Sequence, residues 1–67
     1  MIKITVNGEN KTIDSVKTIS NLLNDLNIDS RKIAVELNLE IIPKSAYNDI
    51  TVAENDKLEI VAFIGGG

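Results

Sequence analysis

The feature that most constrains the fold is a strand-like run at residues 57–64, which is followed directly by Gly65, Gly66 and Gly67. Glycine has no side chain to pack and propagates regular structure poorly, so regular structure is expected to end before residue 65. Within the run we expect Leu58, Ile60 and Ala62 on one inward face. A strand this apolar must be buried among the strands that precede it.

The N-terminal segment predicts a β-hairpin. Ile2, Ile4 and Val6 alternate with polar residues, as in a half-buried strand. The Asn7-Gly8 pair that follows is a strong hairpin signal, because both residues tolerate a positive φ. The return strand is expected at residues 11–14.

A short amphipathic helix is predicted next. Thr18 suits the N-cap position, and Asn27 can close the helix in the left-handed region. The apolar residues between them recur at the helical spacing and would form one face: Ile19, Leu22, Leu23 and Leu26.

The second half of the chain predicts two further strands before the final one. Ile33, Val35 and Leu37 share one face of a strand, and a turn at residues 38–40 leads to a short strand that Pro43 ends. Residues 44–52 are expected to be irregular, with Tyr47 as a satellite core residue.

This ββαββ order predicts an α+β fold with a mixed sheet and one main helix packed across it. The first and last strands would lie side by side in the centre of the sheet, which is the ubiquitin-like β-grasp architecture. We expect residues 1–64 to form this domain and residues 65–67 to form a flexible C-terminal glycine tail. Three extended residues would reach roughly 10 Å beyond it.

Composition excludes several classes of function. The 67 residues include no cysteine and no histidine, so a thiol nucleophile, a cysteine-based zinc site and a histidine base are all absent. We expect no catalytic residue, no bound metal or cofactor, and no enzyme activity of the chain itself. No apolar stretch approaches the ~20 residues needed to span a bilayer, and the N-terminus lacks a signal-peptide pattern. We therefore expect no membrane association and a cytoplasmic location.

Charge gives an indication of the kind of partner. The net charge is −3, which makes nucleic acid an unsuitable partner. Residues 33–67 hold two basic and six acidic side chains, so the half that ends in the glycines favours a basic protein surface.

Taken together, these segments resemble the ThiS-type sulfur carriers of thiamin thiazole biosynthesis. The matching pieces follow one another in family order: residues 4–9, Thr18-Ile19, Leu22-Leu23, residues 33–38, residues 41–44 and residues 56–67. Two positions depart from the family pattern. Leu39 replaces a frequent glycine in the mid-chain turn, and Asn55 replaces a glycine before the last strand.

The resemblance implies a carrier that partner enzymes act upon. An E1-like adenylyltransferase of the ThiF type would use ATP and magnesium to adenylate the carboxylate of Gly67. A sulfur donor such as a cysteine desulfurase would convert it to a thiocarboxylate, and a thiazole synthase of the ThiG type would take the sulfur. Gly65 and Gly66 would let the terminus enter a narrow active site.

Candidate partner-binding residues are Val61, Phe63, Ile64 and Lys44. Val61 and Phe63 lie on the strand face opposite Leu58, and apolar and aromatic residues are common at interfaces. Each also has a purely structural interpretation, and for Lys44 that is a solvated lysine after a strand-ending proline. The alternatives for the whole chain are a molybdopterin-synthase-type sulfur carrier, a ubiquitin-like modifier, and an interaction module with an incidental glycine end.

Overall fold

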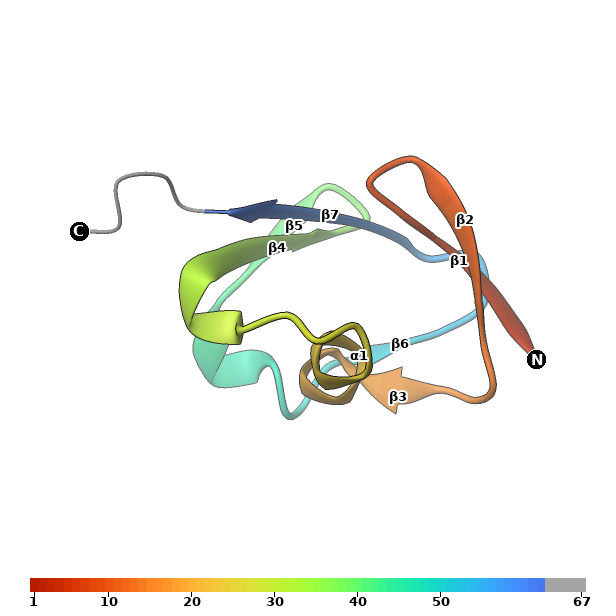
Figure 1. The fold of residues 1–67 in the computed structure, drawn as a ribbon, viewed down its shortest axis with the longest axis horizontal. Helices are drawn as coiled ribbons and strands as arrows, with labels where there is room; N and C mark the ends of the chain where they lie inside the picture. Colours follow the sequence, from red (N-terminus) through yellow and green to blue (C-terminus); the bar gives the residue numbers. More distant parts are fainter. Residues whose placement is uncertain (63–67) are drawn as a thin grey trace.

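The structure is a computed structural model that describes residues 1–62 (Figure 1). Its regular elements follow the chain in this order: β1 (Ile2–Val6), β2 (Glu9–Ile13), β3 (Lys17–Thr18), α1 (Ile19–Asp25), the 3-10 turn η1 (Ser30–Lys32), β4 (Ile33–Leu37), β5 (Glu40–Ile42), the 3-10 turn η2 (Lys44–Ala46), β6 (Thr51–Val52) and β7 (Lys57–Ala62).

Five strands form one mixed sheet in the order β2-β1-β7-β4-β5. Strands β1 and β7 pair in parallel, whereas the other neighbours are antiparallel. The helix α1 lies across one face of this sheet (Figure 1). The predicted α+β fold, a β-grasp with the first and last strands adjacent in the centre, is therefore confirmed.

A second, two-stranded sheet was not predicted. Strand β3 pairs with β6, with Lys17 opposite Val52 and Thr18 opposite Thr51. The expectation that residues 44–52 are irregular was therefore wrong, because this segment contains both η2 and β6. Strands of two residues are too short to show an alternating pattern, so only their pairing in the folded chain reveals them.

The ends of α1 follow the sequence prediction. The Thr18 hydroxyl accepts a hydrogen bond from the backbone N–H of Asn21 at 3.1 Å, as an N-cap should. Asn27 adopts the left-handed conformation with φ 59° directly after the helix. The seven-residue helix is too short to be stable alone, so its stability comes from packing.

The core lies between α1 and the covered face of the sheet. Its buried residues come from every layer of the fold: Ile4, Val6, Ile19, Leu22, Leu23, Ile33, Val35, Ile42, Tyr47, Val52 and Leu58. The expectation that Tyr47 is a satellite core residue was wrong, because it belongs to this main core. Burial raises the pKa of its phenol, since the charged form would lose water.

The inward face of β7 is shorter than predicted. Leu58 is buried and Ile60 is partly buried, but Ala62 is exposed although it has the same strand parity. Ala62 pairs with Ile33, the first residue of β4, so it lies where the sheet ends. The alternation correctly predicted which side chains of β7 share the inward face. It could not show how far along the strand the rest of the domain covers that face.

The β4–β5 turn contains a strained residue. Asn38 and Leu39 have φ of 51° and 72°, as in a two-residue hairpin with positive φ at both central positions. Asparagine adopts this conformation readily, whereas leucine places its Cβ too close to the backbone. Leu39 is also 88% exposed, so packing does not offset the strain.

We therefore expect Leu39→Gly to raise the free energy of unfolding by about 0.5–1 kcal/mol. The free energy gained when the left-handed strain is relieved is larger than the free-energy cost of the conformational entropy that glycine loses on folding. Leu39→Ala is the matched control, because it removes the exposed side chain but keeps the Cβ. Urea denaturation of both variants tests the prediction, and equal stability of the glycine and alanine variants would contradict it.

Candidate functional site

The candidate site lies at the C-terminal end of β7, where the described chain leads toward the three glycines. Strand β7 is held on both sides. Its pairing with β4 extends over five residue pairs, from Leu37 opposite Leu58 to Ile33 opposite Ala62. On its other side, Lys57 and Leu58 pair with the end of β1. The segment that precedes the glycines is thus anchored in the centre of the sheet.

Asn7 extends this anchoring one step farther along β7. Its backbone N–H donates to the carbonyl of Leu58 at 2.9 Å. Its side-chain oxygen then accepts from the N–H of Ile60 at 2.7 Å, and its side-chain nitrogen donates to the carbonyl of Ile60 at 3.1 Å. On this edge of β7, the side chain of Asn7 therefore forms the hydrogen bonds to Ile60 that a residue of a neighbouring strand would otherwise form. Sequence reasoning assigned Asn7 only to the hairpin turn.

The beginning of β7 is fixed by a second asparagine. The Asn38 side chain accepts from the backbone N–H of Lys57 and donates to the Asp56 carboxylate, both at 3.0 Å. The other oxygen of Asp56 accepts from the N–H of Ala53 at 2.8 Å. Asn38 thus fixes the first residue of β7 and Asn7 fixes its middle, at Ile60, so β7 forms a fixed base for the segment that follows it.

The sheet face that α1 does not cover carries exposed and half-buried side chains of β7, β4 and β5. Val61 is 60% exposed, as its predicted outward orientation requires, and Ile41 on β5 is 74% exposed. Val61 stands opposite Ala34, whereas Glu59 stands opposite Glu36, which in turn stands opposite Ile41. We call Val61, Ile41, Glu36 and Glu59 the outer-face patch. The sequence did not reveal that the two glutamates face each other.

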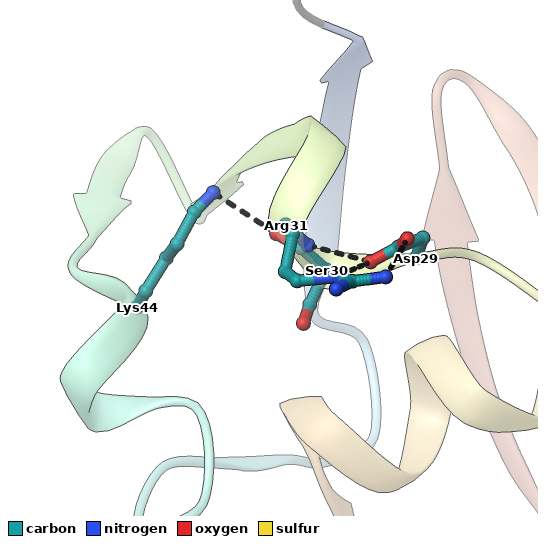
Figure 2. A network of polar contacts seen from close by, with 4 residues as sticks. All are labelled: Asp29, Ser30, Arg31 and Lys44. Carbon is teal, nitrogen blue, oxygen red and sulfur yellow. Dashed lines mark hydrogen bonds and ion pairs between the residues drawn. The ribbon is translucent and has the colours of Figure 1, made fainter.

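Among the other predicted partner-binding residues, only Lys44 lies within the described part of the chain. Phe63 and Ile64, like Gly65, Gly66 and Gly67, lie outside the described residues. Lys44 lies on η2, and its ammonium donates to the backbone carbonyl of Ser30 at 2.9 Å (Figure 2). It also donates to the backbone carbonyl of Ile33 at 2.8 Å. It therefore ties η2 to the start of β4 and is not part of the outer-face patch.

The carbonyl of Ser30 belongs to the turn η1, which is stabilised by the ion pair between Asp29 and Arg31. The Asp29 carboxylate accepts from the backbone and side-chain N–H groups of Arg31, at 2.9–3.1 Å (Figure 2). The Arg31 hydrogen bonds lower the pKa of Asp29 to about 2. Asp29 thus stays ionised at pH values well below those at which an aspartate ordinarily takes up a proton. Its hydrogen bonds to Arg31 hold η1 in the geometry that presents the Ser30 carbonyl to Lys44.

We expect Lys44→Met to lower the free energy of unfolding by about 1 kcal/mol, because two hydrogen bonds from a charged donor are lost. Lys32→Met is the matched control: Lys32 is an exposed lysine of η1 whose ammonium forms no hydrogen bond within residues 1–62. Chemical denaturation of both variants provides the measurement. Unchanged stability of Lys44→Met would argue against the structural tie.

Across residues 1–62, no three acidic, histidine or cysteine residues are grouped so that they could hold a metal ion. Over the same residues, every buried side-chain polar atom has a hydrogen-bond partner. No helix within this part of the chain is long and apolar enough to cross a membrane. What the arrangement can do is hold one strand rigidly and present the segment after it.

Comparisons with known proteins agree with this geometry. The sequence profile of the ThiS family matches residues 4–67. The sulfur carrier protein ThiS of Bacillus subtilis is 40% identical over 50 residues, which are 75% of this chain and 76% of that protein. The crystal structure of the thiamine biosynthesis protein ThiS from Geobacter metallireducens superposes with a TM-score of 0.88 at 33% identity. That match covers 98% of this chain and 100% of the other.

Longer proteins contain a similar segment. A thiazole synthase of Paramagnetospirillum magneticum is 54% identical over 66 residues, and one of Magnetococcus marinus is 36% identical over 66 residues. Each match covers 98% of this chain but only 20% of the synthase. This chain therefore spans one fifth of the length of these two relatives.

Proposed function

This chain belongs to the ThiS family of sulfur carriers, and we propose that the carboxylate of Gly67 is the group that carries the sulfur. The observation that supports this most directly is the family match over residues 4–67, which includes all three terminal glycines. The anchored β7 adds a physical reason, because a fixed base lets a partner enzyme locate the glycines that follow.

The proposed chemistry begins with activation of a poor electrophile. The Gly67 carboxylate attacks the α-phosphorus of ATP, pyrophosphate leaves, and an acyl-adenylate forms. ATP and magnesium are used by the adenylating partner. A sulfur nucleophile then forms a C–S bond as the C–O bond to AMP breaks, and AMP leaves with the electron pair. Hydrosulfide gives the thiocarboxylate directly, whereas a persulfide donor requires a thiol to reduce the resulting acyl disulfide.

We propose three partners for this sequence of steps. An E1-like adenylyltransferase of the ThiF type activates the terminus, and a donor such as a cysteine desulfurase supplies the sulfur. A thiazole synthase of the ThiG type accepts it, which is supported by the segment similar to this chain within two thiazole synthases. In this scheme the chain is a cosubstrate of these enzymes and contributes its terminus.

The proposed partner-binding residues remain Val61, Phe63, Ile64 and Lys44. Val61 has the strongest support, because it is exposed beside the end of the described strand. Lys44 remains a candidate with a structural role as well, since its ammonium is already hydrogen-bonded to two backbone carbonyls.

Mass spectrometry tests the proposed function directly. The chain is incubated with a purified ThiF-type adenylyltransferase, ATP, magnesium and sulfide, and the C-terminal peptide is then isolated. We expect an oxygen-to-sulfur exchange on that peptide, which depends on ATP and is lost in a version that lacks Gly66 and Gly67. Mapping to the C-terminal peptide is essential, because oxidation of Met1 changes the mass by nearly the same amount. An unchanged C-terminal peptide would refute the carrier proposal.

A further inference from the structure

The turn between β1 and β2 has the sequence Asn7-Gly8, and no other asparagine of the chain is followed by glycine. Both residues have a positive φ, 52° for Asn7 and 81° for Gly8, as in a two-residue hairpin turn. Both are exposed, and a Cβ placed on Gly8 would meet no other described part of the chain within 4 Å. The backbone of this turn is therefore open to water.

The side chain of Asn7 takes the place of a strand beside Ile60. The pairing of β1 with β7 ends at Val6 opposite Leu58. Two residues farther along β7, the Asn7 amide accepts from the N–H of Ile60 at 2.7 Å and donates to its carbonyl at 3.1 Å. In an antiparallel pair, a residue exchanges both backbone hydrogen bonds with its partner or neither. The Asn7 amide thus satisfies the two groups of Ile60 that β4 leaves unpaired.

We propose that Asn7 is a site of spontaneous deamidation, and that its two hydrogen bonds to Ile60 slow this reaction in the folded chain. The backbone nitrogen of Gly8 attacks the side-chain carbonyl carbon of Asn7, and a cyclic succinimide forms. The bond from that carbon to the side-chain nitrogen breaks, and ammonia leaves with the proton of the Gly8 N–H. Water then opens the ring at either carbonyl, which gives aspartate or isoaspartate at position 7.

A second asparagine shows why the residue after Asn7 matters. Asn38 occupies the same position in the β4–β5 turn, with φ 51°, and its side-chain oxygen also accepts from a backbone N–H of β7, at Lys57. Leu39 follows Asn38, and its side chain hinders the approach of its backbone nitrogen to the amide. Gly8 has no Cβ and offers no such hindrance. The chain thus contains two asparagines in similar settings that differ in the next residue.

The contact with β7 controls the rate of the reaction. An amide that is fixed on Ile60 cannot turn its carbonyl carbon toward the Gly8 nitrogen until both hydrogen bonds open. The reaction in the folded chain therefore requires local opening between Asn7 and β7, and its rate follows the population of that open state.

Deamidation would weaken the hold on β7. A carboxylate at position 7 can accept from the N–H of Ile60, but it has no proton to donate to the Ile60 carbonyl, which then faces a negative charge. Isoaspartate also lengthens the backbone of the turn by one methylene. An aged chain would therefore hold β7 less firmly two residues before the strand ends. The modification needs only water, so it does not depend on the proposed function.

The test follows the full chain in mildly alkaline buffer, with and without urea, by peptide mapping and ammonia release. In urea we expect Asn7 to deamidate at least about tenfold faster than Asn38, because glycine lacks a hindering side chain. Without urea, Asn7 should react at least about tenfold more slowly than in urea, since its bonds to Ile60 must first open. Equal rates for the two asparagines in urea, or an equal rate of Asn7 in both conditions, would overturn the proposal.

A milder perturbation isolates the contact with β7. Leu58→Ala weakens this strand and should speed the deamidation of Asn7, whereas Val61→Ala, on the exposed face of β7, is the matched control and should leave it unchanged. If Leu58→Ala does not fold, urea concentrations below the unfolding transition replace it. Deamidation of Asn7 and hydrogen exchange of the Ile60 N–H should then rise together. A deamidation rate that responds to neither perturbation would overturn the role of the contact.

Asn7→Asp measures the effect of the product on the fold. We expect it to lower the denaturation midpoint and to speed hydrogen exchange in β7. Asn10→Asp is the matched control, because it adds the same charge on β2 at an exposed side chain that forms no hydrogen bond within residues 1–62. A lower midpoint in Asn7→Asp alone supports the proposed effect on β7, and equal midpoints of the two variants would refute it.

Discussion

Gly67→Ala is expected to lower the rate of C-terminal adenylation about 100-fold while the free energy of unfolding stays unchanged. The added Cβ lies next to the carboxylate, where it crowds the attack of that carboxylate on the α-phosphorus of ATP. It also removes backbone conformations that glycine alone adopts readily. A misplacement of the reacting group by about 1 Å is enough for an effect of this size. Pyrophosphate release with a ThiF-type adenylyltransferase measures it.

The neighbouring glycines provide graded controls. Gly66→Ala should show a similar loss, whereas Gly65→Ala should be milder because residue 65 is farther from the reacting carboxylate. Thermal denaturation followed by circular dichroism checks that all three variants fold as the wild type does. Equal adenylation rates for Gly67→Ala and the wild type would contradict the prediction and weaken the assignment of Gly67.

Leu58→Ala is expected to lower the free energy of unfolding by about 3 kcal/mol. Leu58 is 1% exposed and lies at the centre of the sheet, opposite Val6 on β1 and Leu37 on β4. Truncation of a buried leucine removes apolar contacts and leaves a cavity, at a cost of about 2–5 kcal/mol. A domain of this size has only about 3–10 kcal/mol in total. Urea denaturation should therefore show a severely weakened domain.

Val61→Ala is the matched control for this prediction, because it shortens a side chain of the same strand on the exposed face. Val61 is 60% exposed, so we expect a change in stability below about 0.5 kcal/mol. Similar destabilisation by the two substitutions would contradict the assignment of the two faces of β7. A loss of stability confined to Leu58→Ala would support it.

Much of the fold could be predicted from local patterns. The alternation in β1 and β4 and the helical spacing of Ile19, Leu22 and Leu23 each indicated an element and its buried face. These patterns are reliable because burial of one face has the same period as the backbone itself. The central place of β7 was expected from its apolar residues, and its neighbours are indeed β1 and β4, although only Leu58 of the strand is buried.

The parts that were not predicted depend on pairing between distant segments. The short strands β3 and β6 exist only because they meet each other. The hydrogen bonds of Asn7 to Ile60 join residues 53 positions apart, and Lys44 reaches carbonyls 11 and 14 positions away. Such contacts leave no periodic pattern, so a turn asparagine and a lysine after a strand-ending proline looked ordinary in the sequence.

Residue types and their order along the chain were enough to indicate the fold class and the family, because both depend on local patterns. The three glycines and the lack of cysteine and histidine also made Gly67 the candidate site, which stays a prediction. The register of β7 against β4, and with it the opposition of Glu36 and Glu59, became visible in the folded chain alone. Register is a relation between two strands, and neither strand specifies it alone, because hydrogen bonds and packing across the sheet select it.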